Sequence, residues 1–239
     1  MITKALETKS TISVAELSDL LQVSVVTVRK DLQRLEDAGK LKRTFGGAAF
    51  QNSTSEEQRR LLAAQRIAER VAQDVEDGDC IIMNAGNTTL LTARNLLNKK
   101  QLKVITNSIS IARELSKHKE FQLIFLGGAM NANAVFTYGR EAIEQLDQYK
   151  ANKLILSVNG ISCSKGLTTR HMEAADLFRK MIERAEKMIV VADDAKFGFE
   201  SFYYVCGLND VDQIVTNASK KSEAELMQME QMGIEICCC

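Results

Sequence analysis

The 239-residue sequence contains no proline, only two histidines, and no stretch approaching 18 consecutive apolar residues. Without proline, turns must be built from Gly, Asn, Asp and Ser, which favour turn conformations for reasons of their own. Without a long apolar run no transmembrane helix is available, so we expect no membrane partner. The amino terminus lacks the basic-then-apolar order of a secretory signal, which predicts a cytoplasmic protein.

The six cysteines include no Cys-x-x-Cys pair. Together with two histidines they offer no ligand set at the spacings of a zinc site, so we expect neither a metal nor a cofactor. Cys80 and Cys206 lie in apolar runs, which predicts small, buried side chains. The run from Cys237 to Cys239 is expected to be a frayed chain end.

Charge divides the chain although the whole is neutral, with 31 basic and 31 acidic side chains. Residues 1–55 hold eight basic and six acidic side chains, which leaves 23 and 25 in the remainder. The sequence therefore combines a mildly basic head with a mildly acidic body. The polar stretch 51–57 lacks periodic apolar positions and predicts a linker. We expect two domains, residues 1–52 and 53–239.

The head carries two stretches with apolar residues at helical spacing. Residues 14–21 form the first, with Ser13 as an N-cap and Glu16 three residues later. Residues 25–35 form the second after a short break. Two short helices joined by a tight turn have helix-turn-helix geometry. Residues 40–50 then predict a basic β-hairpin with a diglycine tip, which is a wing.

The second helix and the hairpin hold the candidate contacts to double-stranded DNA. Ser24 can cap the helix, and its hydroxyl suits a DNA phosphate. Thr27, Lys30 and Arg34 lie one turn apart and can share the groove-facing side. The alternative is a solvated charged face on a packing helix, but the adjoining basic hairpin favours DNA. The predicted DNA-binding residues are Ser24, Thr27, Arg29, Lys30, Arg34, Lys42, Arg43, Gly46 and Gly47.

In the body, short apolar strands alternate with amphipathic helices after an opening helix at residues 61–75. This alternation predicts an α/β layered domain around a mainly parallel sheet. The predicted strands are residues 80–84, 103–106, 122–126, 153–158, 187–192, 213–216 and 234–237, and the predicted helices are 90–97, 108–116, 141–148, 174–184 and 222–232.

The loop at residues 84–89 (Asn-Ala-Gly-Asn-Thr-Thr) lies between an apolar strand and a helix. Its glycine lets the backbone approach a ligand, and its threonines lie beside helical N–H groups, which suits a phosphate. The alternative is a plain turn with a threonine cap. Ligands of open α/β sheets bind outside the carboxyl ends of the strands, where several similar loops fall. Lys196 can neutralise an anion there, or is an exposed loop lysine.

Residues 24–32 (Ser-Val-Val-Thr-Val-Arg-Lys-Asp-Leu) and 46–48 (Gly-Gly-Ala) resemble the head of the DeoR family of bacterial transcriptional regulators. The resemblance continues through segments 84–89, 166–169 and 193–198 and covers nearly the whole chain. It implies a winged helix-turn-helix joined to a sensor domain similar in fold to ribose-5-phosphate isomerase. It also implies a homo-oligomer, a dimer or tetramer, and a phosphorylated sugar as inducer.

The prediction is a sequence-specific regulator, a repressor of a sugar or polyol operon whose DNA binding is relieved by a phosphorylated sugar. His171 is an additional, weaker candidate for the effector site. Many family members carry Asp in place of Asn84 and Asn159, so we hypothesise a sugar with a different hydroxyl pattern, or weaker selectivity. The predicted effector-binding residues are Asn84, Gly86, Asn87, Thr88, Thr89, Asn107, Ser108, Gly127, Gly128, Asn159, Gly160, Glu173 and Lys196.

The competing prediction is a sugar-phosphate isomerase with a basic appendage. Proton abstraction beside a carbonyl needs a positioned carboxylate base, and Glu173, Asp193 and Asp194 are available. Asn84 and Asn159 replace acidic groups near the same loops, which favours sensing over turnover. An activator rather than a repressor stays open.

Overall fold

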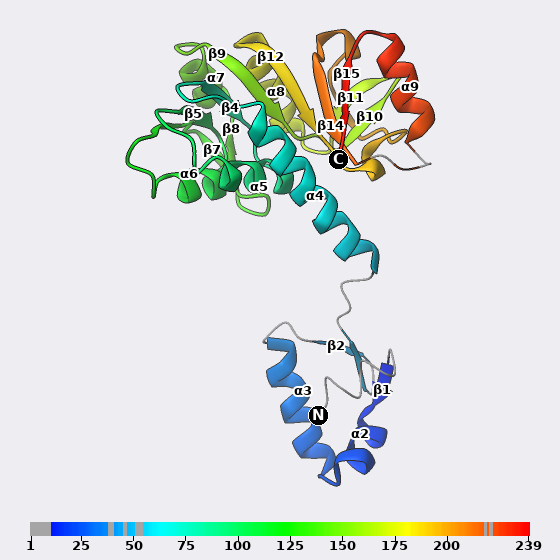
Figure 1. The fold of residues 1–239 in the computed structure, drawn as a ribbon. Coiled ribbons are helices and arrows are strands. Elements are labelled where there is room, and N and C mark those ends of the chain that lie inside the picture. The colour runs from blue at the N-terminus through cyan, green and yellow to red at the C-terminus, as the bar shows by residue number, and fades with distance from the viewer. Residues whose placement is uncertain (1–10, 38–40, 45–46, 51–54, 218, 220–221) are drawn as a thin grey trace. The chain divides into compact units, whose positions relative to one another are not determined.

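The protein, seen here as a computed structural model, is described over residues 11–37, 41–44, 47–50, 55–217, 219 and 222–239. The chain divides into two compact units, residues 1–59 and 60–239 (Figure 1). The predicted boundary after residue 52 lies outside the described residues. No described helix is both long and apolar enough to cross a membrane.

The described part of the head contains two helices and a three-stranded antiparallel sheet of order β1-β3-β2. This confirms the helix-turn-helix and the hairpin, whereas β1 was not predicted because three residues carry too little pattern. The elements are β1 (Thr11–Ser13), α2 (Val14–Leu21), α3 (Val25–Asp37), β2 (Leu41–Thr44) and β3 (Gly47–Phe50).

The predicted cap of α2 is confirmed as a complete capping box. The Glu16 N–H donates to Ser13 Oγ at 3.1 Å, and the Ser13 N–H donates to Glu16 Oε2 at 2.9 Å. Gln22 ends the helix in the left-handed region, with φ of 53°. The apolar sides of both helices then meet in one small core formed by Ile12, Val14, Leu17, Val28 and Leu32.

Helix α4 (Ser55–Gln73) begins inside the stretch predicted as linker. The linker prediction is therefore wrong for residues 55–57. Acidic residues stabilise the first turn of a helix, so a helix can begin where no apolar periodicity marks it. Farther along α4, Ile67 and Val71 are fully buried, and so is Val75, just beyond the end of the helix. These side chains pack on the body's main sheet.

The body is built on a seven-stranded parallel sheet of order β15-β14-β12-β9-β4-β5-β6. This confirms the predicted α/β fold class. Every predicted strand is present, and two have the predicted bounds. The strands are β4 (Cys80–Met83), β5 (Lys103–Thr106), β6 (Gln122–Phe125), β9 (Ala151–Leu156), β12 (Ala185–Val191), β14 (Gln213–Thr216) and β15 (Glu235–Cys238).

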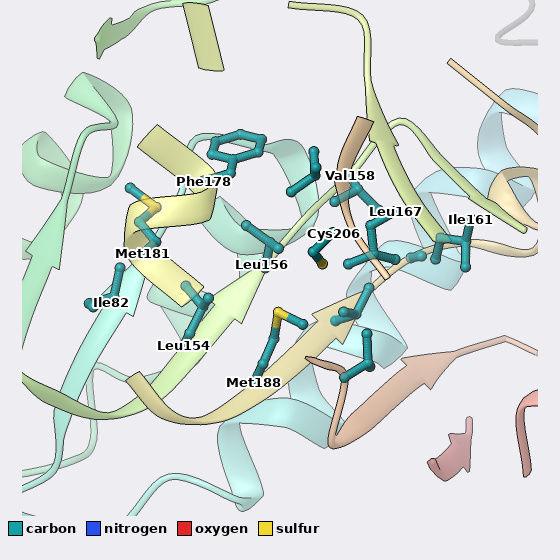
Figure 2. Packing of buried hydrophobic residues seen from close by; sticks show 14 of the residues in the cluster. Ile82, Leu154, Leu156, Val158, Ile161, Leu167, Phe178, Met181, Met188 and Cys206 are labelled. Atoms are coloured by element: carbon teal, nitrogen blue, oxygen red, sulfur yellow. The ribbon is translucent and has the colours of Figure 1, made fainter. Parts of the chain in front are cut away.

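Helices cover both faces of the main sheet (Figure 1). One face is buried by α4, α5 (Asn87–Asn95) and α6 (Ile109–Leu115). The other is buried by α7 (Arg140–Leu146), α8 (Met172–Glu183) and α9 (Glu223–Gln231). Figure 2 shows the α8 side chains Phe178 and Met181 above Leu154 and Leu156 of β9. Because both faces are covered, the strands are continuous apolar runs.

Two small antiparallel sheets were not predicted. The first is a hairpin of β7 (Ala129–Asn131) and β8 (Phe136–Tyr138). The second has the order β10-β11-β13 and packs into the core beneath α8. Strands of three or four residues carry too short an alternation to stand out in a sequence. The second sheet comprises β10 (Gly160–Ser162), β11 (Gly166–Thr169) and β13 (Tyr203–Cys206). The described residues also form two 3-10 helices, η1 (Asp194–Lys196) and η2 (Leu208–Asp210).

The prediction of a frayed end at Cys237–Cys239 is wrong. Strand β15 pairs in parallel with β14, with Cys238 opposite Thr216. The Cys239 N–H extends this ladder to the Thr216 carbonyl at 3.0 Å. Cys206 is buried as predicted, whereas Cys80 is only partly buried. Among the described residues, no group of acidic, His and Cys side chains could hold a metal ion.

An ion pair fixes the start of β4. Lys153 Nζ lies 2.6 Å from Asp79 Oδ2, and the backbone N–H of Glu76 donates to the same oxygen at 2.8 Å. The Asn152 amide donates to the other carboxylate oxygen. Burial alone would raise the pKa of Asp79, but these hydrogen bonds outweigh it and hold the pKa below its ordinary value.

Candidate effector site and DNA-binding helix

The order of the main sheet fixes where a ligand can bind. Strands β5 and β6 follow β4 on one side, whereas β12, β14 and β15 follow β9 on the other. The connections leaving the neighbouring strands β4 and β9 therefore diverge and open a crevice outside their carboxyl ends. A cavity of about 470 Å³ lies there, lined by residues that follow β4, β5 and β9.

Six of the predicted effector-binding residues line this cavity. They come from four separate loops, which the fold brings together as the sequence pattern indicated. His171, the weaker candidate, also lines it. The six are Gly86, Asn87, Thr88, Ser108, Asn159 and Lys196.

Helix α5 points its amino end at the cavity. Gly86 is its N-cap and makes no side-chain cap, while Asn87 and Thr88 follow as its first residues. The first N–H groups of a helix have no intrahelical partner and carry a partial positive charge. Lys196, half-buried on η1, adds a full positive charge to the lining, and Asp193 adds a carboxylate.

Asn84 lies beneath the cavity rather than in its wall. Its side chain is fully buried. Its Nδ2 donates to the Ser157 carbonyl at 2.7 Å, and its Oδ1 accepts from the Ser157 N–H at 2.8 Å. The amide thus ties the end of β4 to the end of β9, with its nitrogen donating to protein and its oxygen accepting from protein. This geometry does not support the hypothesis that Asn84 forms hydrogen bonds to the hydroxyls of a sugar.

Thr89 and Asn107 also support the loops from beneath. The Thr89 hydroxyl donates to the Asn84 carbonyl at 2.8 Å and lies 3.0 Å from the Gly86 carbonyl. The Asn107 amide accepts from the Ala85 N–H at 3.2 Å and donates to the Thr137 carbonyl at 2.9 Å. Both side chains are fully buried and hold the loop that follows β4.

Three predicted glycines lie outside the cavity lining. Gly127 donates its N–H to Gln145 at 2.9 Å. Gly128 has a φ of +126°, and a Cβ there would lie 2.5 Å from the Tyr138 carbonyl oxygen. Gly160, predicted as a loop residue, instead begins β10. Gly128 and Gly160 allow another backbone segment to pack closely.

Glu173 lies in the first turn of α8, outside the cavity lining. Its carboxylate accepts from the Asn131 amide at 2.8 Å, which joins the β7–β8 hairpin to α8. Its own backbone N–H and Asn131 hold the pKa of Glu173 below its ordinary value. Asn131 Oδ1 meanwhile accepts from the N–H groups of Asn133 and Ala134, at 3.1 and 3.0 Å.

The loop of this hairpin, residues 133–136, forms a cavity wall that the sequence did not predict. The ring of Phe136 contacts His171 edge-on, with centroids 5.6 Å apart. Val135 has a φ of +57°, which is an outlier for a β-branched residue. The one sequence signal was the Asn131-Ala-Asn133 stretch, since Asn favours turns.

The predicted DNA contacts on α3 lie on an exposed face. Ser24 Oγ accepts from the Thr27 N–H at 3.2 Å, which makes it the predicted cap. Lys30 and Arg34 are exposed one turn apart. Val26, 74% exposed in the first turn, has no packing role and was not predicted. Of the remaining predicted residues, Thr27 and Arg29 are exposed as well.

The hairpin residues are only partly described. Lys42 and Arg43 lie in β2, with side chains outside the described set, and Gly46 lies outside the described residues. Gly47 is buried in β3, where a Cβ would lie 2.3 Å from the Ile12 carbonyl oxygen. Its glycine is therefore explained by the close approach of β1.

Comparison with known proteins identifies the family. Residues 1–54 match the DeoR-like helix-turn-helix domain, and residues 61–218 match the DeoR C terminal sensor domain. The chain belongs to the DeoR family. The transcriptional regulator YulB of Bacillus subtilis is 34% identical over 98% of this chain and 93% of its own length. The repressor GlcR of the same species is 34% identical over 94% and 89%.

This DeoR-family chain is a DNA-binding transcriptional regulator. Its relatives are named as regulators and repressors, which decides against the isomerase alternative. Among solved structures, ribose-5-phosphate isomerase A of Methanocaldococcus jannaschii matches 56% of this chain and 53% of its own, with 16% identity and a TM-score of 0.41.

Proposed function

We propose that the protein is a repressor of a sugar or polyol utilisation operon, released from its operator by a phosphorylated sugar or polyol in the cavity. One observation carries the proposal: the amino end of α5, capped by Gly86, opens on a cavity of about 470 Å³. Unpaired helical N–H groups suit a phosphate monoester. Thr88 adds a hydroxyl and Lys196 a charged amine.

The rest of the lining suits the hydroxyls of the same ligand. Asn159 Oδ1 already accepts from the Thr169 hydroxyl and the Arg170 N–H, each at 3.1 Å. Its amide nitrogen is thus the group that meets the ligand, and it donates to a hydroxyl. Asp193 supplies an acceptor, and Phe136 supplies an apolar surface for the carbon chain.

The predicted effector residues outside the lining have a supporting role in this proposal. Asn84, Thr89 and Asn107 hold the loop after β4, and Glu173 holds the hairpin through Asn131. Loss of one of these contacts misplaces the lining rather than removing a ligand contact. The supporting residues therefore affect stability as well as affinity.

On the DNA side, α3 is proposed as the recognition helix. Lys30 and Arg34 supply phosphate and base contacts, and Val26 is suited to a thymine methyl group. The head has a net charge of only +2, so a single copy has few phosphate contacts to offer. A dimer doubles the DNA contacts and matches a two-fold operator. For the effector to release DNA, it must bind the DNA-competent and the DNA-incompetent arrangement of the protein with different affinities.

The test measures binding of the full chain to its own upstream DNA at fixed salt, with a panel of sugar phosphates. One compound is expected to release the DNA. Lys196→Gln is expected to weaken binding of that compound about 10-fold or more, because the substitution removes a charge-assisted contact. The matched control Lys100→Gln lies just before β5, away from the cavity, and should bind normally. Specific DNA binding that no compound releases would overturn the effector assignment.

A further inference from the structure

Strand β15 places the thiol of Cys237 in a polar cluster at one side of the main sheet. Strands β14 and β15 pair in parallel, with Gln213 opposite Glu235. Because side chains alternate along a strand, Glu235 and Cys237 lie on the same face as Gln213. Arg70 and Asp74, at the end of α4, meet them there. We call these five residues the Cys237 cluster. None of the five lines the effector cavity.

Two N–H groups point at the sulfur of Cys237. Arg70 Nη2 donates to Sγ at 3.5 Å, and Gln213 Nε2 donates to it at 3.3 Å. Hydrogen bonds to sulfur favour the charged thiolate over the thiol, most of all when the donor is a cation. The thiolate is the nucleophilic form of cysteine, and reactive thiols are typically part-exposed and adjacent to a basic side chain. Cys237 is only partly buried, so a small reagent can reach it.

The carboxylates of the cluster do not cancel this effect, because each has a basic partner. Asp74 Oδ1 lies 2.5 Å from Arg70 Nη1, and Glu235 Oε2 lies 3.3 Å from Lys187 Nζ. The two positive and two negative charges therefore balance. Glu235 Oε1 in turn accepts from the Cys237 thiol, with Sγ and Oε1 3.7 Å apart. A proton acceptor thus lies beside the sulfur.

Gln213 carries a buried oxygen that points to an additional ligand group. Its side chain is 1% exposed, and its Nε2 also donates to Asp74 Oδ2 at 3.1 Å and to Glu235 Oε1 at 3.2 Å. Two carboxylates therefore fix the orientation of the amide. Among the side chains that the structure describes, Gln213 Oε1 is the one buried nitrogen or oxygen without a hydrogen-bond partner. A buried acceptor without a donor is unfavourable, so a group that brings a donor to the cluster is stabilised there.

We propose that Cys237 is a site of oxidation by hydrogen peroxide, which converts its thiol to a sulfenic acid. Glu235 accepts the thiol proton, and the thiolate attacks one peroxide oxygen. The S–O bond forms as the O–O bond breaks, so the sulfur loses two electrons and the peroxide gains them. The departing hydroxide takes the proton from Glu235 and leaves as water. The new sulfenic O–H is a donor beside the Gln213 carboxamide, whose oxygen lacks one.

The two neighbouring thiols lack this environment. Cys238 is exposed and lies on the opposite face of β15, where it lines a separate groove beside α9. Desolvation of the thiol, with Cys237 and Glu230 nearby, raises the pKa of Cys238. Cys239 donates its thiol to the Thr216 carbonyl at 3.5 Å, and burial raises its pKa. Exposure alone predicts that Cys238 reacts first, whereas the cluster predicts Cys237.

The test treats the reduced full chain briefly with hydrogen peroxide in the presence of dimedone, which traps sulfenic acids. Fragmentation mass spectrometry then locates the adduct within residues 237–239. The adduct at Cys237 is expected to form about 10-fold faster than at Cys238, since a charge-assisted hydrogen bond is worth about one power of ten. Arg70→Gln should remove most of this advantage. The matched control Arg66→Gln removes the same charge one turn earlier on α4, at an exposed side chain, and should react as wild type does.

A conservative variant separates loss of charge from loss of structure. Arg70→Lys keeps a cation at the end of α4 and should retain more of the Cys237 rate than Arg70→Gln, with both variants melting as folded proteins. Adducts that form first at Cys238, or equally at both positions, refute the proposal, and so does an unchanged rate at Cys237 in Arg70→Gln. None of these results bears on the proposed function, because neither DNA nor a sugar phosphate is present in the assay.

Discussion

Replacing Asn84 by Asp changes one buried atom from a donor to an acceptor. Asn84 Nδ2 lies 2.7 Å from the Ser157 carbonyl oxygen, in a side chain with no exposed surface. In Asn84→Asp an oxygen faces that carbonyl at a distance that only a hydrogen bond can stabilise. The contact from the Ser157 N–H survives, because a carboxylate oxygen accepts it equally well.

Asn84→Asp is expected to lower the free energy of unfolding by about 3 kcal/mol at neutral pH. A buried carbonyl left without a donor costs about 1–3 kcal/mol, and burying a charge adds to this. For a body of this size, that lowers the melting temperature by roughly 6–12 °C. Burial and the facing carbonyl raise the pKa of the new carboxyl above its usual value of about 3.9.

This shift gives the variant a distinctive pH dependence. A carboxyl whose pKa is raised in the folded state binds its proton more tightly there than in the unfolded chain. The protonated acid can also donate to the Ser157 carbonyl. The stability deficit of Asn84→Asp is therefore smallest at low pH and grows as pH rises through the folded pKa. Calorimetric melting of the variant and wild type at about pH 5 and pH 7.5 measures this difference.

The matched control is the same chemical change at the other departure from the family pattern. Asn159 is half-buried, and within the part of the chain that the structure describes only the Oδ1 atom of its side chain is hydrogen-bonded. Asn159→Asp therefore keeps both accepted hydrogen bonds. The free energy of unfolding of Asn159→Asp should lie within roughly 1 kcal/mol of the wild-type value. The variant should instead change the order of affinities for the sugar phosphates. An Asn84→Asp variant that melts as wild type does while altering that order would contradict the supporting role of Asn84.

Three further predictions concern Asp79, two cysteine thiols and Gly128. Asp79→Asn should lower the free energy of unfolding by about 3 kcal/mol at neutral pH. Because the pKa of Asp79 is depressed in the folded state, the stabilisation by its carboxylate is present above about pH 4 and lost below it. The melting curves of variant and wild type should therefore converge in acid. Burial, with Glu225 beside Cys163, raises the pKa of Cys163 and Cys206 to about 12, so native alkylation at neutral pH should spare both until the chain is unfolded. Gly128→Ala should lower the melting temperature by an amount equivalent to about 1–3 kcal/mol, from strain at its positive φ.

The sequence predicted the parallel sheet and the edge at which the cavity lies. Strands 103–106 and 213–216 have the predicted bounds, because a parallel sheet covered on both faces needs continuous apolar runs that stand out. The capping box of Ser13 and Glu16 was also readable, since its partners lie three residues apart. The spacing of residues in the sequence is enough to predict a feature whose interacting residues are close together in the chain.

Features that depend on distant segments could not be predicted. The hairpin wall at residues 133–136 and the strand at Cys238 are stabilised by pairing with other parts of the chain. Strands this short carry little pattern of their own. Gly47 was predicted to contact DNA, yet a glycine there is explained by the close approach of β1, which pairs with β3 at this position.

The sequence by itself determined the family, the two-part architecture and four of the loops that surround the cavity. The tertiary structure decided which of those loop side chains face the cavity and which face protein. Asn84 and Asn159 are the same residue type at the ends of neighbouring strands, but Ser157 binds both ends of the Asn84 amide and only one atom of Asn159 is bound by protein. Side-chain direction at a strand end depends on the backbone groups of the adjoining strand, which no local pattern specifies.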